Sequence, residues 1–335
     1  MSSIPFTVTL RYDSPKVISA TCRALVQEMQ RSIDGSEGLT RSWTLSFSEV
    51  DQYEDETSMK IRKFMQKNEI RKLTITKTEG SIAQKLILAF GCVFFNIERI
   101  HLESLKNIPD QNTTFCSIFR KARSLQEIQL IDMKLSAHVI EEWARIEIPR
   151  PPLKKLICLE VVFEGGESSE QHFANVLQRQ TALEELGIEP SQLGMSLKFL
   201  GPKIKLLNNL TSLSLSNIEV EALVGEDQSC YLSFTQVQER TMEHLSMIEC
   251  GLTHESLQTI FTDRRFERLR SLDLSRNPGI EERDIDNLKR MYPFLVAGSD
   301  TSHIDSPSES NSLDGDSDSN RSLDTQPIWD STQQY

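Results

Sequence analysis

A pair of apolar residues separated by one residue recurs along this chain about every 28 residues. The pairs are Leu45/Phe47, Leu73/Ile75, Ile100/Leu102, Ile128/Leu130, Leu156/Cys158, Leu186/Ile188, Leu213/Leu215, Leu245/Met247 and Leu272/Leu274. Eight of the nine pairs have another apolar residue three positions earlier, and only the first has Ser42 there. A fixed period of this length is the sequence signature of a repeat architecture.

Each repeat predicts one short strand followed by one helix. Alternate side chains of a strand point to the same face, so the two residues of a pair are buried together while their neighbours point the other way. The second half of the repeats has a helical pattern in SIAQKLILAFGC (81–92), TFCSIFRKA (114–122), SAHVIEEWARI (136–146), SEQHFANVLQRQ (169–180) and THESLQTIFTDRRF (253–266). Such units bury their apolar faces against their neighbours, which predicts an α/β solenoid of about nine strand-helix units.

The repeats resemble leucine-rich repeat proteins of the ribonuclease-inhibitor-like class. The matching segments are IRKLTI, IERIHL, LQEIQL, LKKLIC, LEELGI, LTSLSL, MEHLSM and LRSLDL, within residues 41–295. The resemblance implies a horseshoe with parallel strands on the concave face and helices outside. That class usually has Asn or Cys at the ninth position, where only Asn277 and Cys250 match here, so we expect an irregular solenoid. We also expect Gly201-Pro202 to interrupt a helix.

The ends of the chain differ from the repeats. Residues 5–11 alternate like a strand and 14–29 read as a helix, so 1–40 are predicted to be an N-terminal cap of the repeat domain, 41–298. Residues 281–295 predict a closing helix.

The last 37 residues, 299–335, contain ten Ser and eight Asp or Glu against one basic residue. Such a composition predicts a disordered acidic tail. Ser302 and Ser306 each precede an acidic residue by three positions and are candidate phosphorylation sites. Trp329 is an isolated aromatic residue and a candidate anchor for a short peptide motif.

Charge and cysteine usage restrict the class and the compartment. A net charge of −12 argues against a general binder of nucleic acid or of anionic membranes. The longest apolar run, 86–95, is about half of a membrane span. The first residues lack a basic start followed by an apolar core, so we expect no secretory signal. The six cysteines form no C-x-x-C, which indicates reduced thiols and a cytoplasmic location, with the nucleus as the alternative.

The sequence contains no recognisable catalytic or metal-binding constellation. It lacks G-x-S-x-G, a phosphate loop and H-E-x-x-H. His138 precedes Glu141 and Glu142, but no second histidine or cysteine stands at ligand spacing, so a solvated helix face is the better interpretation. We therefore expect a chain that is not an enzyme and that takes no cofactor or metal.

The residues between the apolar ones define a candidate partner-binding surface on the concave face. Its members are Arg71, Lys72, Lys77, Arg99, His101, Glu103, Gln129, Ile131, Ile157, Leu159, Glu185 and Glu189. The first third is basic, a later part is acidic, and three apolar residues lie between them. A slip of register by one residue would instead bury Ile157 and Leu159 in the core.

These features favour a non-enzymatic scaffold or adaptor that binds a protein partner on the concave face. One alternative is a GTPase activator of the Ran type, which has similar repeats and an acidic tail. Another is the substrate-recognition subunit of a ubiquitin ligase, although no F-box pattern precedes the repeats. The acidic tail could also bind the basic concave strip within the same chain.

Overall fold

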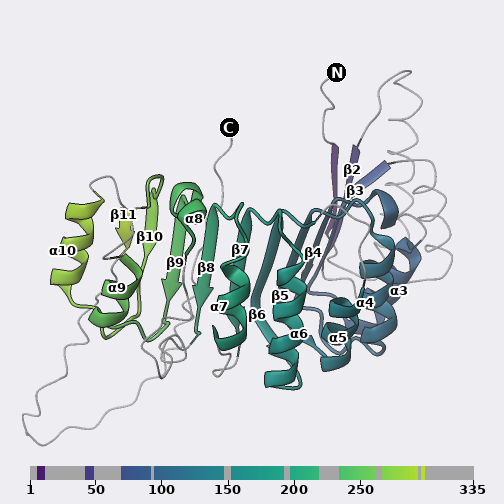
Figure 1. Cartoon of the computed structure of the whole chain (residues 1–335). Helices are drawn as coiled ribbons and strands as arrows, with labels where there is room; N and C mark the ends of the chain where they lie inside the picture. Colours follow the sequence, from purple (N-terminus) through teal and green to yellow (C-terminus); the bar gives the residue numbers. More distant parts are fainter. Residues whose placement is uncertain are drawn as a thin grey trace, which may run out of the picture. The chain divides into compact units, whose positions relative to one another are not determined.

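The computed structural model describes residues 6–11, 42–48, 69–91, 94–146, 152–191, 197–218, 234–261, 266–292 and 296–298. Eleven parallel strands lie side by side in chain order and form one open sheet (Figure 1). They are β1 (Phe6–Arg11), β2 (Ser42–Ser48), β3 (Glu69–Thr76), β4 (Arg99–Glu103), β5 (Glu127–Leu135), β6 (Lys155–Phe163), β7 (Glu185–Pro190), β8 (Ser212–Ser216), β9 (His244–Ile248), β10 (Ser271–Asp273) and β11 (Val296–Gly298).

The register of the sheet follows the apolar pairs. Leu73 pairs with Ile100, Ile100 with Ile128, and Ile128 with Leu156. The row continues through Leu186, Leu213, Leu245 and Leu272. The predicted strand positions and their alternation are therefore confirmed from β2 to β10. The two outer strands extend the sheet beyond these nine, and β1 matches the strand expected at residues 5–11.

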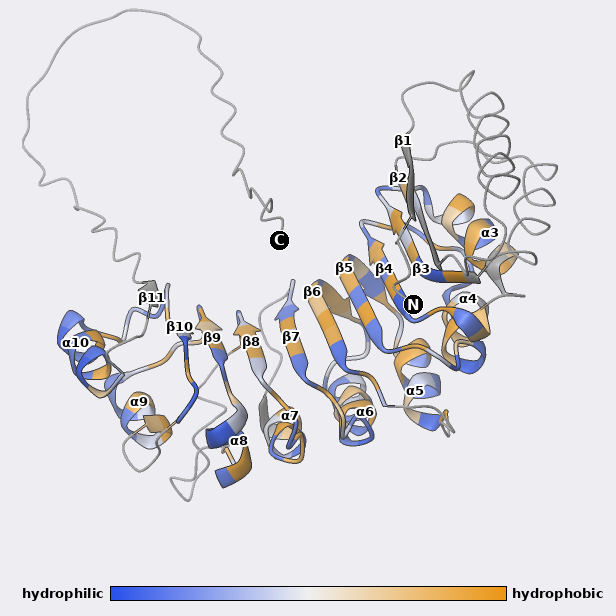
Figure 2. Ribbon diagram, turned by 90° about the horizontal axis from the view of Figure 1, so that it is seen from above, coloured by the Kyte–Doolittle hydropathy of each residue, from blue (hydrophilic) through white to orange (hydrophobic). Residues whose placement is uncertain are grey.

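The described helices alternate with the strands and cover one face of the sheet (Figure 2). They are α3 (Gly80–Phe90), α4 (Gln111–Lys121), α5 (Ala137–Arg145), α6 (Glu167–Gln178), α7 (Leu197–Ile204), α8 (Gln236–Thr241), α9 (His254–Phe261) and α10 (Glu282–Met291), with a short 3-10 helix, η1 (Phe94–Asn96). These positions confirm the helical segments expected from the sequence, including the closing helix. The result is an α/β fold of alternating units, compatible with a solenoid.

The expected break at Gly201-Pro202 is wrong, because α7 continues through Pro202. Pro202 has no backbone N–H to donate within the helix, but Leu200 and Ile204 on either side of it are fully buried. Burial of these two side chains holds the short helix against its neighbours despite the missing hydrogen bond.

A single apolar core runs between the sheet and the helices. The paired residues of β3 to β10 are almost fully buried, and aromatic side chains connect successive helices. The rings of Phe119 and Trp143 stack at 4.3 Å, and Trp143 meets Phe173 edge-on at 6.3 Å. Each unit thus buries its apolar surface against the next one, as the repeat predicts.

Most units have a residue in the left-handed backbone conformation at the same position. Positive φ angles occur two residues after the second member of the apolar pair, at Lys77, Ser104, Asp132, Glu160, Asn217, Glu249 and Arg276. The amide of this residue reaches the next unit, as in the bond from Ser104 N to Ile131 O. Pro190, the last residue of β7, occupies the equivalent position and cannot adopt a positive φ. The register shift between β6 and β7 occurs at this point.

Asn277 bonds the backbone of two adjacent units. Its Oδ1 accepts hydrogen bonds from Cys250 N at 2.9 Å and Leu252 N at 3.0 Å. Its Nδ2 donates to Met247 O at 2.7 Å and Leu274 O at 2.8 Å. The residues at this position in three other units, Leu105, Met133 and Ile218, are buried apolar side chains instead.

Several expectations lie outside the described residues. These are the helix at 14–29, the acidic tail at 299–335 with Ser302, Ser306 and Trp329, and three of the cysteines. Among the helices that the structure does describe, none combines the length and apolar character that a membrane crossing requires.

We predict that Leu272→Ala lowers the free energy of unfolding by about 2–5 kcal/mol, because it leaves a cavity in the core. Ser271→Ala, on the opposite face of the same strand, should change it by no more than about 0.5 kcal/mol. Urea denaturation followed by circular dichroism measures both. Equal losses would contradict the register of β10.

We predict that Asn277→Leu lowers the free energy of unfolding by about 1–3 kcal/mol for each backbone group left unpaired. The same experiment on Asn287→Leu provides a matched control, because Asn287 is exposed on α10. A loss at Asn277 no larger than at Asn287 would show that these bonds do not hold the units together.

Candidate interaction surface

The face of the sheet opposite the described helices carries three rows of side chains, which we call the sheet face. The cross-strand pairs place equivalent residues of successive units next to each other. The first row is Lys72, Arg99, Glu127, Lys155, Glu185, Ser212, His244 and Ser271. The second is Thr74, His101, Gln129, Ile157, Gly187, Ser214, Ser246 and Asp273. The third includes Thr76, Glu103, Ile131, Leu159 and Glu189.

Most of the predicted surface residues lie on this face, but Lys77 and Arg71 do not belong to its rows. Lys77 follows β3 in the left-handed turn and is exposed at the end of the strand. Arg71 precedes the first row and lies beside Glu98, which starts the next unit. The sequence interpretation counted residues by alternation and did not foresee where the strand ends.

The charges of the sheet face are largely paired between neighbouring strands. Arg99 Nε lies 3.2 Å from Glu127, and Lys155 Nζ lies 2.8 Å from Glu185. The expected basic strip therefore does not present all of its cations to solvent as unpaired charges. Alternation along each strand places these four residues on one face, but their pairing depends on which strands lie side by side.

The residues just before the first row repeat this arrangement. Arg71 Nη1 lies 3.0 Å from Glu98, and Lys154 Nζ lies 3.3 Å from Glu184. Exposed pairs of this kind contribute little to stability. Their effect here is to leave this border of the sheet close to electrically neutral.

An apolar centre lies between the charged pairs. Ile131, Ile157 and Leu159 are half-buried, whereas Leu156 and Cys158 on the same strand as the last two are fully buried. The alternative register, in which Ile157 and Leu159 would be core residues, is therefore wrong. The three side chains come from the adjacent strands β5 and β6 and form one patch.

The absence of a side chain at Gly187 lets the Ile157 side chain extend over β7. A Cβ atom at Gly187 would stand 2.8 Å from Ile157 Cδ1 and 3.9 Å from Leu159 Cδ2. The side chain of Ile157 therefore occupies the space that any other residue at position 187 would fill. From β7 onward, the second row has the small residues Gly187, Ser214 and Ser246.

Glu189 lies at the border of this apolar centre. Burial raises the pKa of Glu189 above its ordinary value, and the negative charge of Glu160 raises it further. Arg276 acts in the opposite direction, but its guanidinium already lies 3.7 Å from Glu249. The carboxylate of Glu189 is thus held in a partly desolvated, negatively charged environment.

His101 lies 3.2 Å from Glu103 and completes the polar part of the face on β4. Its neighbour in the second row, Gln129, lies on β5 beside the apolar centre. These residues can form hydrogen bonds with a partner. In the part of the chain that the structure describes, none of them lies beside a nucleophilic side chain in a catalytic arrangement.

The described cysteines are poor candidates for reactivity. Burial raises the pKa of Cys158 to about 12 and that of Cys250 to about 11, which suppresses the thiolate. Cys116 is also buried, and its pKa is raised by the same cause. His138 is exposed on α5 and lies 3.5 Å from Glu141. Within the described ranges, no three potential metal-binding side chains come together.

The chain matches no model of a known protein family, and a comparison with curated proteins finds no similar sequence.

We predict that Glu189→Gln raises the free energy of unfolding at neutral pH. The raised pKa means that the folded state binds the proton more tightly than the unfolded state, so the charged carboxylate opposes folding. The gain should disappear as the pH falls through the raised pKa and below the ordinary value, because Glu189 is then neutral in both states. Urea denaturation at about pH 7 and about pH 3 tests this.

Glu282→Gln is the matched control, since Glu282 is exposed in the first turn of α10. It should give no gain at neutral pH. An equal gain in both variants would mean that overall net charge, and not the surroundings of Glu189, causes the effect.

Proposed function

We propose that this chain is a ribonuclease-inhibitor-like leucine-rich repeat solenoid that acts as a non-enzymatic scaffold or adaptor. Its partner would be another protein, bound across the sheet face, which is the concave face of such a solenoid. No catalytic step, cofactor or metal enters this proposal, and we expect the chain to work in the cytoplasm or the nucleus.

The repeat class is supported by three features that recur together. The units alternate one short strand and one helix, with the apolar pairs in register from β2 to β10. A left-handed residue lies two positions after the apolar pair in most units, and several of these residues donate their amide to the next unit. Asn277 bonds the backbone of two adjacent units, as the ninth-position asparagine of that class does.

The observation that carries the binding proposal is the apolar centre of Ile131, Ile157 and Leu159. These side chains are half-buried on a face that no described helix covers. The ion pairs of the first row and the carboxylate of Glu189 lie at their border. An apolar centre with a polar rim is the usual anatomy of a protein interface. Nine strands at about 4.8 Å give a surface about 40 Å long. That length accommodates an interface of about 800 Å² per partner.

We predict that the double change Ile131→Asp and Leu159→Asp abolishes partner binding by the full chain. A charged residue in the centre of an interface is left desolvated and unpaired when the partner docks. The measurement is affinity capture from native extract with mass spectrometry, followed by titration of the purified partner.

Val237→Asp with Leu206→Asp is the matched control, because both residues are exposed and apolar and lie on the helix side, in and next to α8 and α7. The control should retain the partner. A partner lost equally from both variants, or retained by both, would remove the sheet face from the proposal.

A further inference from the structure

Basic side chains gather at the ends of four successive helices. They are Arg120 and Lys121 in the last turn of α4, Arg123 after it, Arg145 at the end of α5, Arg179 after α6, Lys203 in the last turn of α7, and Lys205 after it. We call this set the helix-end belt. It is separate from the sheet face, because these residues belong to the helical layer.

Contacts between side chains link the belt from one helix to the next. Arg120 Nη2 of α4 lies 2.7 Å from Glu142 Oε2 of α5. Arg179 Nη1 donates to Ile146 O at the end of α5 at 3.1 Å. Lys203 Nζ donates to Gln178 Oε1 of α6 at 2.7 Å. The four helix ends therefore form one continuous surface.

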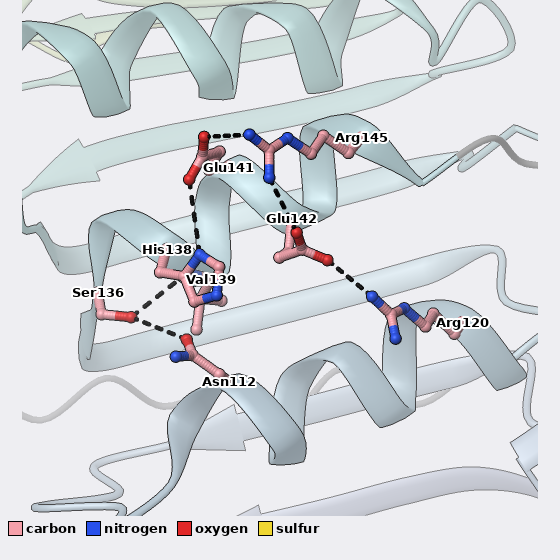
Figure 3. Close-up of polar contacts among 8 residues, drawn as sticks. All are labelled: Asn112, Arg120, Ser136, His138, Val139, Glu141, Glu142 and Arg145. Carbon is pink, nitrogen blue, oxygen red and sulfur yellow. Dashed lines mark hydrogen bonds and ion pairs between the residues drawn. The ribbon is translucent and has the colours of Figure 1, made fainter.

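Only two of the seven cations are neutralised by described carboxylates. Arg120 pairs with Glu142, and Arg145 pairs with Glu141 at 2.6 Å and with Glu142 at 3.2 Å (Figure 3). The other five, which have no carboxylate among the described residues within ion-pair distance, are Lys121, Arg123, Arg179, Lys203 and Lys205. In a chain with a net charge of −12, this local excess of positive charge is unusual.

The helix dipole accounts for part of the belt. Cations in the last turn of a helix interact favourably with the partial negative charge there, which explains Arg120, Lys121 and Lys203. It does not explain the hollows between these helix ends, nor the exposed aromatic ring beside one of them.

Two hollows open on the belt. One has a volume of about 590 Å³ and is lined by Gly91, Phe95, Asn96, Arg120, Lys121, Arg123 and Ser124. The other has a volume of about 410 Å³ and lies between α5 and α6, with Arg145, His172 and Arg179 in its lining. No carboxylate lines either hollow among the described residues. Volumes of this size hold side chains of a bound segment.

Phe95 adds an apolar contact to the first hollow. Phe95 is 52% exposed, the largest value among the exposed large apolar residues of the described ranges. It lies beside the two unpaired cations Lys121 and Arg123. An aromatic ring next to cations can hold a ligand that is both aromatic and anionic.

We propose that the helix-end belt is a second binding surface, which takes an extended acidic segment of a protein that carries an aromatic residue. The carboxylates would meet the unpaired cations, and the aromatic side chain would enter the hollow at Phe95. Packed helices lie about 8–10 Å apart. An extended chain advances about 3.3 Å per residue, so acidic residues about three positions apart match successive helix ends. This proposal stands independently of the sheet face.

A protein segment fits the belt better than a nucleic acid does. Nucleic-acid affinity comes mainly from neutralising many regularly spaced phosphates with a large basic surface. Here five unpaired cations lie on a chain whose total charge is negative, so a long polyanion would be repelled beyond the belt. A short acidic segment needs only the local charge.

The test uses the full chain and a fluorescein-labelled peptide, Glu-Glu-Glu-Trp-Glu-Glu-Glu, with fluorescence anisotropy at low salt. We predict that Lys121→Glu with Arg123→Glu weakens binding at least about tenfold, which is about 1.4 kcal/mol. Lys289→Glu with Arg290→Glu is the matched control, since these exposed cations occupy the last turn of α10, which lines neither hollow. It should change the affinity less than about twofold, since distant exposed charges are screened.

A second experiment tests the contribution of the hollow at Phe95 to binding. Phe95→Ser should weaken binding of the Trp peptide but not of a peptide with Ser in place of Trp. The Ile131→Asp and Leu159→Asp variant should bind both peptides normally, which separates this proposal from that for the sheet face. No peptide binding by the intact chain, or equal losses in the hollow and control variants, would refute the proposal. Tighter binding of a seven-nucleotide single-stranded RNA would refute the choice of occupant.

Discussion

The mutual burial of the apolar pairs of neighbouring units holds this structure together. Leu73, Ile100, Ile128 and Leu156 lie in one row of the sheet, and each is almost fully buried by the units on both sides. A unit of about 28 residues cannot exclude water from its own apolar face. This row also decides which strand residues lie on the sheet face, because neighbours along a strand point to opposite faces.

The regularity of this row explains why the fold could be predicted from the sequence. The strands and most helices follow from the period, and the parallel order of the strands follows from the resemblance to leucine-rich repeat proteins. The period does not report where a strand ends, so Lys77 was placed on the face although it lies in the left-handed turn. The period also does not show that burial can outweigh a proline. Gly201-Pro202 was therefore expected to interrupt a helix, which the buried side chains of Leu200 and Ile204 stabilise instead.

Which residues belong to the sheet face could largely be predicted from the sequence, but the ion pairs between them could not. Alternation assigns Arg99, Glu127, Lys155 and Glu185 to one side, and their charges suggest a basic region followed by an acidic one. The pairing of Arg99 with Glu127, and of Lys155 with Glu185, comes from strands that lie side by side in the sheet. The partners are 28 or 30 residues apart in the sequence, so their pairing is seen only once the register of neighbouring strands is known.

The charges of the sheet face are largely paired, whereas two other regions of each repeat carry an excess of one sign. Just after the apolar pairs, Asp132, Glu160, Glu189 and Glu249 supply negative charge in β5, β6 and β7 and after β9. The ends of α4 to α7 are basic. Strands and helices run in opposite directions in each unit, so these two regions lie at opposite edges of the repeat. The apolar centre and the helix-end belt share no residue, so the two partners that we propose would not compete for the same side chains.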